Sequence, residues 1–151
     1  MEAEAIDALR RVLDPVQAEL IPAHVTLCRE DELDGVSAAE FTRRLGLGRP
    51  VDLSFGAPQL FHGHGVLLPA VGDLSAFDSL RRIALGRESV RQHSPHITLA
   101  HPRNPQAPGN TAANVLLAPT GLRVTFTEVV LIEQTNTAPW QVLEHFTLSI
   151  G

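Results

Sequence analysis

The sequence predicts an α+β fold, organised as a single domain over residues 1–151. Helical and strand-like patterns follow one another irregularly, and several connections have hairpin length, which favours α+β over a doubly wound parallel sheet. The chain has 44% apolar and 19% charged residues, enough to bury one core and unlike a disordered chain. A tetrapeptide recurs in the two halves, which suggests a duplicated lobe. The predicted elements are a helix over 2 to about 14, strand 23–29, helix 37–45, strands 51–55 and 66–71, helix 73–85, strand 95–100, a short helical or irregular piece around 112–117, a β-rich run over 122–133 and a final strand 140–150.

The helices are marked by apolar residues at helical spacing and by start and stop signals. Asp14-Pro15 stops the first helix. Ser37-Ala38-Ala39-Glu40 has the form of a capping box, and Gly46 ends the helix that it starts. Asp73 caps the third helix and Gly86 stops it. We therefore expect three helices before the second copy of the tetrapeptide.

The strands are marked by alternation of side chains and by turn residues at their ends. Strands 51–55 and 66–71 are joined by a loop rich in Gly, Pro and His. Strand 95–100 is followed by segment 103–110, whose prolines and glycine predict a loop long enough to reach over a cleft.

Charge and composition limit the class of protein. The formal net charge of −5 argues against binding of long nucleic acid, which requires a basic surface to neutralise many phosphates. A small phosphorylated substrate carries few charges and is less strongly disfavoured. No apolar stretch is long enough to span a bilayer and the acidic N-terminus is unlike a signal peptide, so a cytoplasmic location is expected. The single cysteine, Cys28, excludes an intramolecular disulfide and is expected to be a small strand residue.

All twelve basic residues are arginines, and several of them surround the second copy of the tetrapeptide. Arginine's planar fork suits phosphate oxygens. Arg81 and Arg82 are expected to form the solvent face of a helix instead. The five arginines of this stretch are Arg81, Arg82, Arg87, Arg91 and Arg103.

The recurring motif is His-x-Thr-Leu, present as His24-Val25-Thr26-Leu27 and as His96-Ile97-Thr98-Leu99. Each copy follows a proline-containing approach and lies on a predicted strand, so we expect the two strands to lie side by side near a pseudo-twofold axis. On a strand, residues two apart share one face about 6.5 Å apart along the chain. Each histidine therefore has a threonine hydroxyl beside it.

This arrangement fits the opening of a cyclic phosphodiester. The reaction needs a base that takes a proton from the attacking water and an acid that protonates the departing ribose oxygen. Histidine, with a pKa of about 6.5, can fill either role. His24 and His96 are thus the predicted catalytic pair, and Thr26 and Thr98 are predicted to donate to the phosphate oxygens. No metal and no cofactor is required.

Two further histidine patterns compete with this pair. His145-Phe146-Thr147-Leu148 matches the motif but lacks the proline approach, so we expect His145 to lie on a sheet outside the cleft. His62-Gly63-His64 is similar to the His-x-His of metal-binding barrels, but no carboxylate follows until Asp73. A polar loop at the cleft mouth is the favoured interpretation of that segment.

The sequence resembles the two-histidine (2H) phosphoesterase superfamily, and within it the 2′-5′ RNA ligase-like and RNA 2′,3′-cyclic phosphodiesterase proteins of the compact bacterial branch. The resemblance implies a bilobal α+β fold, with two pseudo-symmetric lobes whose antiparallel sheets line a central cleft and whose helices lie outside. It also implies metal-free ring opening of 2′,3′-cyclic phosphates to 2′-phosphates by the two histidines. It covers nearly the whole chain and rests on the leading helix with Asp14-Pro15, both His-x-Thr-Leu motifs, His101-Pro102-Arg103-Asn104, Leu131-Ile132-Glu133-Gln134 and Trp140.

Further residues are candidates for contact with the substrate. Arg103, with Asn104, follows the second motif and is placed to bind phosphate. Phe61 could stack on a base, and packing in the core is an equally good interpretation. His64 and His101 are possible contacts near the cleft mouth and the strand end.

Alternative functions remain open. Family relatives join or cleave 2′-5′ linkages in RNA, and others act on ADP-ribose cyclic phosphate or on cyclic signalling nucleotides. The chain could also be a non-catalytic phosphate- or RNA-binding module, or a metal-dependent barrel enzyme centred on His62 and His64. The expected partner is a small cyclic-phosphate nucleotide or a short RNA end, without extended nucleic acid or membrane.

One departure from the family concerns the start of the chain. Family members usually begin with a strand before the first helix, and here Met1 stands almost inside that helix. An open sheet edge would invite pairing with a second chain. A monomer is expected, with a dimer through that edge as the alternative.

Overall fold

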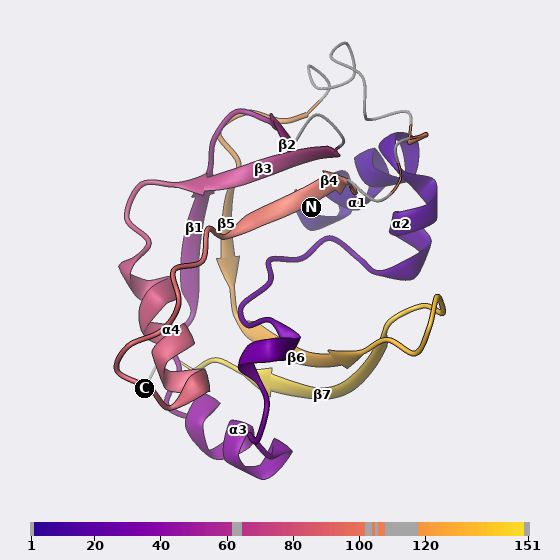
Figure 1. The fold of residues 1–151 in the computed structure, drawn as a ribbon. Helices are drawn as coiled ribbons and strands as arrows, with labels where there is room; N and C mark the ends of the chain where they lie inside the picture. Colours follow the sequence, from indigo (N-terminus) through magenta and orange to yellow (C-terminus); the bar gives the residue numbers. More distant parts are fainter. Residues whose placement is uncertain (1, 62–64, 102–103, 105, 108–117, 150–151) are drawn as a thin grey trace.

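The computed structural model describes residues 2–61, 65–101, 104, 106–107 and 118–149. Helices and antiparallel sheets are mixed in it, which confirms the α+β prediction (Figure 1). The elements are α1 (Glu2–Leu13), α2 (Pro15–Leu20), the 3-10 helix η1 (Glu30–Glu32), α3 (Ala38–Leu45), β1 (Val51–Phe55), β2 (Gln59–Phe61), β3 (Gly65–Val71), α4 (Ser75–Leu85), β4 (His96–Ala100), β5 (Arg123–Phe126), β6 (Glu128–Glu133) and β7 (Gln141–Thr147).

The strands form two antiparallel sheets. In the five-stranded sheet β3 pairs with β4 along one edge and with β2 and β1 along the other, and β5 lies beyond β1. Strands β6 and β7 pair with each other as a separate ribbon. Figure 1 shows the chain segment after α2 running between β4 and this ribbon. The segment carries the first motif, so both sheets flank it.

The leading helix agrees with its predicted bounds, but a second helix follows it at once. Asp14 breaks the helix and caps α2, because its carboxylate accepts from Gln17 N at 3.3 Å. Pro15 then occupies the first turn of α2, where its missing N–H costs nothing. The stop signal was correctly located, but the start signal in the same residues was missed.

Helices α3 and α4 match their predictions within two residues. Ser37 caps α3 by accepting from Glu40 N at 3.2 Å, while the Glu40 carboxylate pairs with Arg44 instead of completing the capping box. Asp73 accepts from Ser75 N at 2.9 Å at the start of α4. Gly86 ends α4 with φ of 62°, a left-handed conformation that favours glycine.

Within the two sheets, two strand predictions need correction. The loop expected between strands 51–55 and 66–71 contains β2, which pairs with β3. The single β-rich run over 122–133 is two strands that part at Thr127. At that residue the chain leaves the five-stranded sheet, where Phe126 pairs with Val51, and enters the ribbon, where Glu128 pairs with Thr147. A change of sheet leaves no mark in the hydrophobic pattern.

The core lies between the five-stranded sheet and the helices. On β4, Ile97 and Leu99 are buried at 4% and 1% exposure and face this core, so His96 and Thr98 project from the opposite, half-buried face. Burial of the apolar face therefore fixes which side chains of the second motif are offered to a substrate. The helices of the described part of the chain are too short or too polar to cross a membrane.

Candidate active site

The two motifs lie side by side. Val25 forms an isolated antiparallel bridge with Ile97, the equivalent residue of the second motif. Residues that flank an antiparallel pair are opposed crosswise, so each motif histidine lies across from the threonine of the other motif. The site thus has the approximate twofold symmetry expected from the repeated tetrapeptide.

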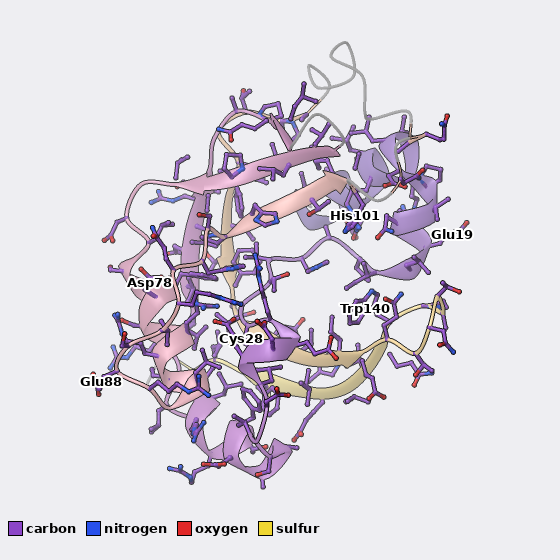
Figure 2. The ribbon with its side chains drawn as sticks, in the orientation of Figure 1. Glu19, Cys28, Asp78, Glu88, His101 and Trp140 are labelled. Carbon is purple, nitrogen blue, oxygen red and sulfur yellow. The ribbon has the colours of Figure 1, made fainter. Side chains whose placement is uncertain are left out.

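The strand predicted over 23–29 is wrong beyond this single bridge. Side chains take the place of a strand ladder, because Ala23 N donates to Asp7 Oδ1 at 2.6 Å and the Leu27 carbonyl accepts from Arg81. Arg29 N donates to Glu32 Oε2 at 2.9 Å. Cys28, expected on this strand, is half-buried beside η1, and burial raises the pKa of its thiol to about 11 (Figure 2).

Both motif histidines are held in the same way. His24 Nδ1 lies 2.8 Å from the Pro22 carbonyl oxygen, and His96 Nδ1 lies 2.9 Å from the Ser94 carbonyl oxygen. A carbonyl can only accept, so Nδ1 carries the proton in each ring and Nε2 is the nitrogen left to exchange protons. The chain approaching each motif therefore sets the tautomer of its histidine.

The surroundings of His24 favour the neutral ring. Burial lowers the pKa of His24 below its ordinary value, although the hydrogen bond to Pro22 opposes this. The positive charge of Arg10, which is 2% exposed, and that of His96 lower the pKa further. A neutral imidazole at this position can accept a proton at neutral pH.

The motif threonines are half-buried. Within the described segments no hydrogen bond occupies the hydroxyl of Thr26 or that of Thr98, so both can donate to a bound oxygen.

A third histidine at the site, His93, carries no motif signature. Its ring centroid lies 6.3 Å from that of His96 and 6.1 Å from that of Phe77 on α4. Burial lowers the pKa of His93, as do the charges of Arg81 and Arg29, whereas a hydrogen bond with the backbone of Thr26 opposes them. Only the position of His93, three residues before His96 on the approach to β4, could have suggested it.

Asp14 ties the end of the second motif to the first two helices. This carboxylate is fully buried and accepts from His101 N at 2.8 Å and from Asn104 Nδ2 at 3.0 Å. Figure 2 shows His101 at the end of β4, close to α1. The Asn104 amide, predicted with Arg103 as a phosphate contact, donates to Asp14.

The predicted contacts Arg103 and His64 lie outside the described residues, as does His62. The same holds for the side chain of Phe61, whose backbone ends β2. His145 lies on β7, 63% exposed at its side chain, with Nδ1 3.4 Å from Glu128 Oε2. The hydrogen-bond partner of His145 is therefore Glu128 on β6, the other strand of the ribbon.

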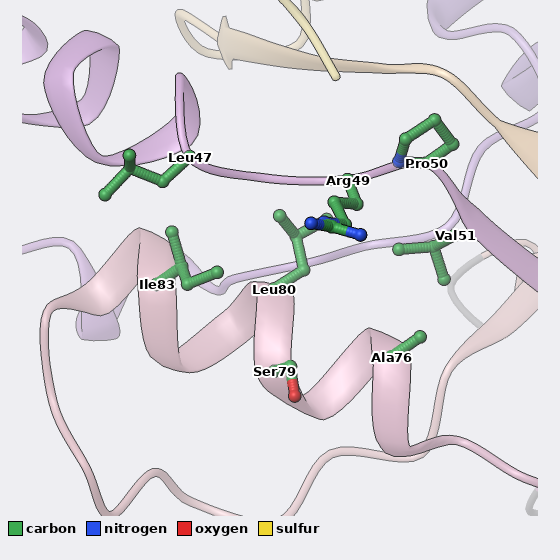
Figure 3. A pocket seen from close by; sticks show the side chains of 8 residues that line it. All are labelled: Leu47, Arg49, Pro50, Val51, Ala76, Ser79, Leu80 and Ile83. Atoms are coloured by element: carbon green, nitrogen blue, oxygen red, sulfur yellow. The ribbon is translucent and has the colours of Figure 1, made fainter. Parts of the chain in front are cut away.

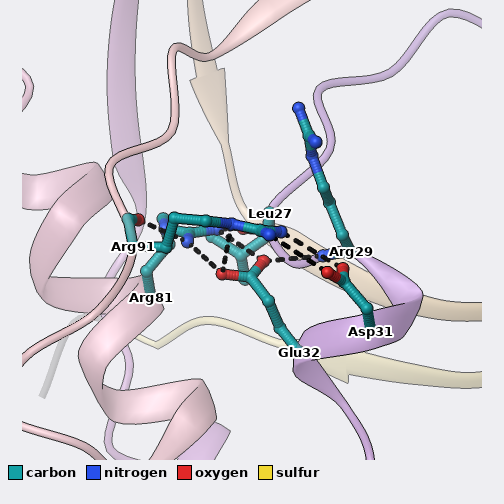
Figure 4. Close-up of polar contacts among 6 residues, drawn as sticks. All are labelled: Leu27, Arg29, Asp31, Glu32, Arg81 and Arg91. Atoms are coloured by element: carbon teal, nitrogen blue, oxygen red, sulfur yellow. Dashed lines mark hydrogen bonds and ion pairs between the residues drawn. The ribbon is translucent and has the colours of Figure 1, made fainter.

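The sequence suggested that Arg81 lies on the solvent face of α4, but this residue is fully buried. Figure 4 shows its polar contacts. Its guanidinium donates to Leu27 O, to Glu32 Oε1 at 2.7 Å and to Arg91 O at 3.0 Å. The first motif and the approach to the second are therefore both fastened to one arginine.

A cavity of about 220 Å³ lies elsewhere, between α4 and the segment 47–51 that leads into β1 (Figure 3). None of the predicted site residues lines it. Among the residues that the structure describes, no three His, Cys, Asp or Glu side chains are grouped to hold a metal. The lining residues of the cavity are Leu47, Arg49, Pro50, Val51, Ala76, Ser79, Leu80 and Ile83.

Comparison with known proteins gives one family and several similar structures. The sequence profile of the 2′-5′ RNA ligase superfamily matches residues 1–138. The Thermus thermophilus protein TT0787 is 19% identical with a TM-score of 0.56, over 97% of this chain and 91% of that one. Escherichia coli LigT, solved in complex with 3′-AMP, is 18% identical with a TM-score of 0.56, over 95% and 93% of the two chains. A structure described as a phosphoesterase is 17% identical with a TM-score of 0.54, over 95% and 94%. No curated protein matches the chain by sequence.

Proposed function

Because the chain belongs to the 2′-5′ RNA ligase superfamily, we propose that it is a metal-independent phosphodiesterase that opens 2′,3′-cyclic phosphates of nucleotides or RNA ends to 2′-phosphates. The family and the phosphoesterase and LigT neighbours support an enzyme of the phosphoesterase or RNA ligase type. One observation carries the finer proposal. Both motif histidines use Nδ1 on a backbone carbonyl, which leaves two Nε2 atoms for proton transfer across one site.

In the proposed reaction a water oxygen attacks phosphorus and the P–O3′ bond breaks. His24, whose pKa is lowered by burial, takes the proton of the water as general base. Protonated His96 gives its Nε2 proton to the departing O3′, so the product carries a 2′-phosphate. Thr26 and Thr98 donate to the non-bridging oxygens, where negative charge collects in the transition state.

The proposed substrate is a ribose phosphate of small size. E. coli LigT was solved with 3′-AMP, a nucleotide that carries its phosphate on the ribose. The substrate proposed for this chain also carries its phosphate on the ribose. The net charge of −5 speaks against a long nucleic acid as substrate. We propose that a mononucleotide or a short RNA end binds, with Arg103 as a further phosphate contact.

The family name also favours a ligase reaction on the same site. If a 5′-hydroxyl replaces water as the attacking group, the same base, acid and leaving oxygen yield a 2′-5′ linkage. Ligation and hydrolysis then share both histidines, so replacing His24 or His96 should abolish both reactions.

The test compares His24→Asn and His96→Asn with the matched control His145→Asn. The substrates are a 2′,3′-cyclic nucleotide, an RNA with a cyclic phosphate end, ADP-ribose cyclic phosphate and a 3′,5′-cyclic nucleotide, with the product position determined. Each motif variant should lose about 10²- to 10⁴-fold in kcat, the range for one general acid or base, while the control keeps its rate. Equal loss in the control would refute the pairing, and turnover that EDTA stops would refute the metal-independent reaction. Binding of the cyclic nucleotide without ring opening would favour a non-catalytic module.

A further inference from the structure

We propose that Arg29 binds the 5′-phosphate of the terminal nucleotide of the substrate, so that the enzyme prefers an RNA end to a cyclic mononucleotide that lacks this group. This inference rests on the proposed function, because it concerns the substrate of the same site. In an RNA end the 5′-phosphate of the terminal nucleotide is the last internucleotide linkage. Arg29 therefore distinguishes the two substrates of the proposed function.

Arg29 lies on a segment that runs antiparallel to the approach to the second motif. At one end of this segment Val25 forms the bridge with Ile97, and at the other end Asp31 pairs with Arg91 through two bonds of 3.0 and 3.1 Å. Asp31 lies six residues after Val25, and Arg91 lies six residues before Ile97, so the ion pair keeps the register of the bridge. Arg29 is therefore held between two contacts that bring the motifs together.

The side chain of Arg29 lies on the same side of the chain as that of Thr26. Val25, Leu27 and Cys28 all pack against the core. The alternation of faces therefore shifts by one residue after Leu27, and Arg29 returns to the side that Thr26 occupies. The two Cα atoms, three residues apart, are at most about 11 Å from each other. Arg29 is thus within reach of the nucleotide whose phosphate Thr26 is proposed to bind.

Arg29 lies at the rim of the site, beside the reacting centre. It is exposed, whereas the motif histidines and threonines are half-buried. Burial lowers the pKa of His93, and nearby charges, that of Arg29 among them, lower it further. The pKa of His24 is lowered by burial and by the charges of Arg10 and His96. A group bound by Arg29 therefore lies next to the reacting phosphate and is not that phosphate itself.

The guanidinium of Arg29 is available to a ligand. In the part of the chain that the structure describes, it takes part in no hydrogen bond or ion pair, although the backbone N of this residue donates to Glu32 Oε2 at 2.9 Å. Figure 4 shows the Arg29 side chain extending away from the carboxylates of Asp31 and Glu32. Those carboxylates are already bonded to Arg91 and to Arg81. A planar guanidinium with a permanent charge suits phosphate oxygens, and the anionic group next to the cyclic phosphate in the terminal nucleotide is its 5′-phosphate.

The experiment measures the preference for the 5′-phosphate as a ratio. The two substrates are adenosine 2′,3′-cyclic phosphate and the same compound with a 5′-phosphate, and the ratio is kcat/KM for the second divided by kcat/KM for the first. It should be about ten in the wild type and close to one in Arg29→Gln, the scale of one charge-assisted hydrogen bond. Arg29→Lys should recover part of the ratio, because it restores the charge without the planar fork. Arg82→Gln, a matched exposed arginine on α4, should keep the wild-type ratio.

A wild-type ratio near one would overturn the proposal. An equal loss on both substrates in Arg29→Gln would also overturn it, because the ratio would then be unchanged. If the wild-type protein turns over no cyclic phosphate, the proposed function fails, and calorimetry with adenosine 3′,5′-bisphosphate and 3′-AMP tests Arg29 by itself. The bisphosphate should bind the wild type about tenfold more tightly than 3′-AMP and lose this advantage in Arg29→Gln. Equal affinities of the two nucleotides for the wild type would refute the contact.

Discussion

At the scale of single residues, the site depends on side chains that bind backbone groups. The approach to His24 is fixed by Asp7, which accepts from Ala23 N, and by Arg10, which donates to Ile21 O at 2.7 Å. Arg81 plays the same part before the second motif. Arg10 lies on α1 and Arg81 on α4, and each donates to a backbone carbonyl just before a motif, so both halves of the chain use the same kind of contact.

The motif threonines give the residue-scale prediction. Thr26→Val and Thr98→Val keep the β-branched shape and remove only the hydroxyl. If each hydroxyl donates to a phosphate oxygen in the transition state, kcat/KM for a cyclic nucleotide should fall about 10- to 100-fold in each variant. Thr147→Val on β7 is the matched control from the third tetrapeptide and should leave kcat/KM unchanged. A control as impaired as the motif variants would contradict these roles.

Sequence patterns located the motif residues but not their supports. His24 and His96 could be predicted because a repeated tetrapeptide is visible in the chain. Arg81 could not, since its contacts with Leu27 and Glu32 span 54 and 49 residues, and its place next to Arg82 suggested a solvent-exposed face. His93 had no repeat to mark it.

At the scale of elements, α4 and η1 are joined by a buried ion pair. Arg81 and Glu32 side chains are 1% and 9% exposed, with 2.7 Å between Nη2 and Oε1. Burial would raise the pKa of Glu32, but hydrogen bonds from Arg81 and from the backbone of Arg29 lower it overall. The pair holds the first motif to the helix before the second.

Breaking this pair gives the element-scale prediction. Arg81→Met leaves the Glu32 carboxylate buried without its partner and the Leu27 carbonyl without its donor, so unfolding free energy should fall by about 3 to 5 kcal/mol. Arg82→Met, the adjacent exposed residue on α4, is the control and should change it by less than about 0.5 kcal/mol. Chemical denaturation measures both. Because Gln carries no charge, Arg81→Met with Glu32→Gln should recover part of the loss, and a double variant as unstable as the single would contradict the ion-pair explanation.

Helices were easier to predict than strands for a physical reason. Caps and stops such as Ser37 and Gly86 act through neighbours in sequence, and both worked as expected. Strand pairing depends on distant segments. The stretch after Pro22 alternates like a strand, yet its backbone groups bind Asp7 and Glu32 side chains instead of a second strand.

At the scale of the whole molecule, the site lies where the chain crosses between two sheets. The Val25–Ile97 bridge joins the first motif to the edge of the five-stranded sheet. This brings two half-buried histidines together with His93, Arg10 and Arg81. Because the pKa values of His24 and His93 are lowered in the folded protein, protonation of these two rings affects the stability of the fold.

The stability of the protein should decrease in mild acid because of these histidines. The pKa of His24 is lowered by burial and by Arg10 and His96, against the Pro22 bond and Asp7. That of His93 is lowered by burial and by Arg81, Arg29 and His96, against the Thr26 bond. As pH falls below about 6.5, these histidines become protonated in the unfolded chain before they do in the folded chain, so the free energy of unfolding decreases as pH falls.

A second, more acidic window belongs to Glu32, whose pKa is lower in the folded state than in the unfolded chain. Ionised Glu32 therefore stabilises the fold at pH values above its ordinary pKa, and this contribution is lost as pH falls through the folded pKa. Chemical denaturation at a series of pH values from about 8 to 4 separates the two windows, since ordinary His and Glu pKa values are about 6.5 and 4.3. His93→Asn should remove only the His93 part of the first window, leaving the His24 part, and should leave the second window unchanged, because asparagine does not titrate and Glu32 keeps both its partners. A wild-type unfolding free energy that stays constant or rises between pH 7 and 5 would show that neither histidine resists protonation in the folded state.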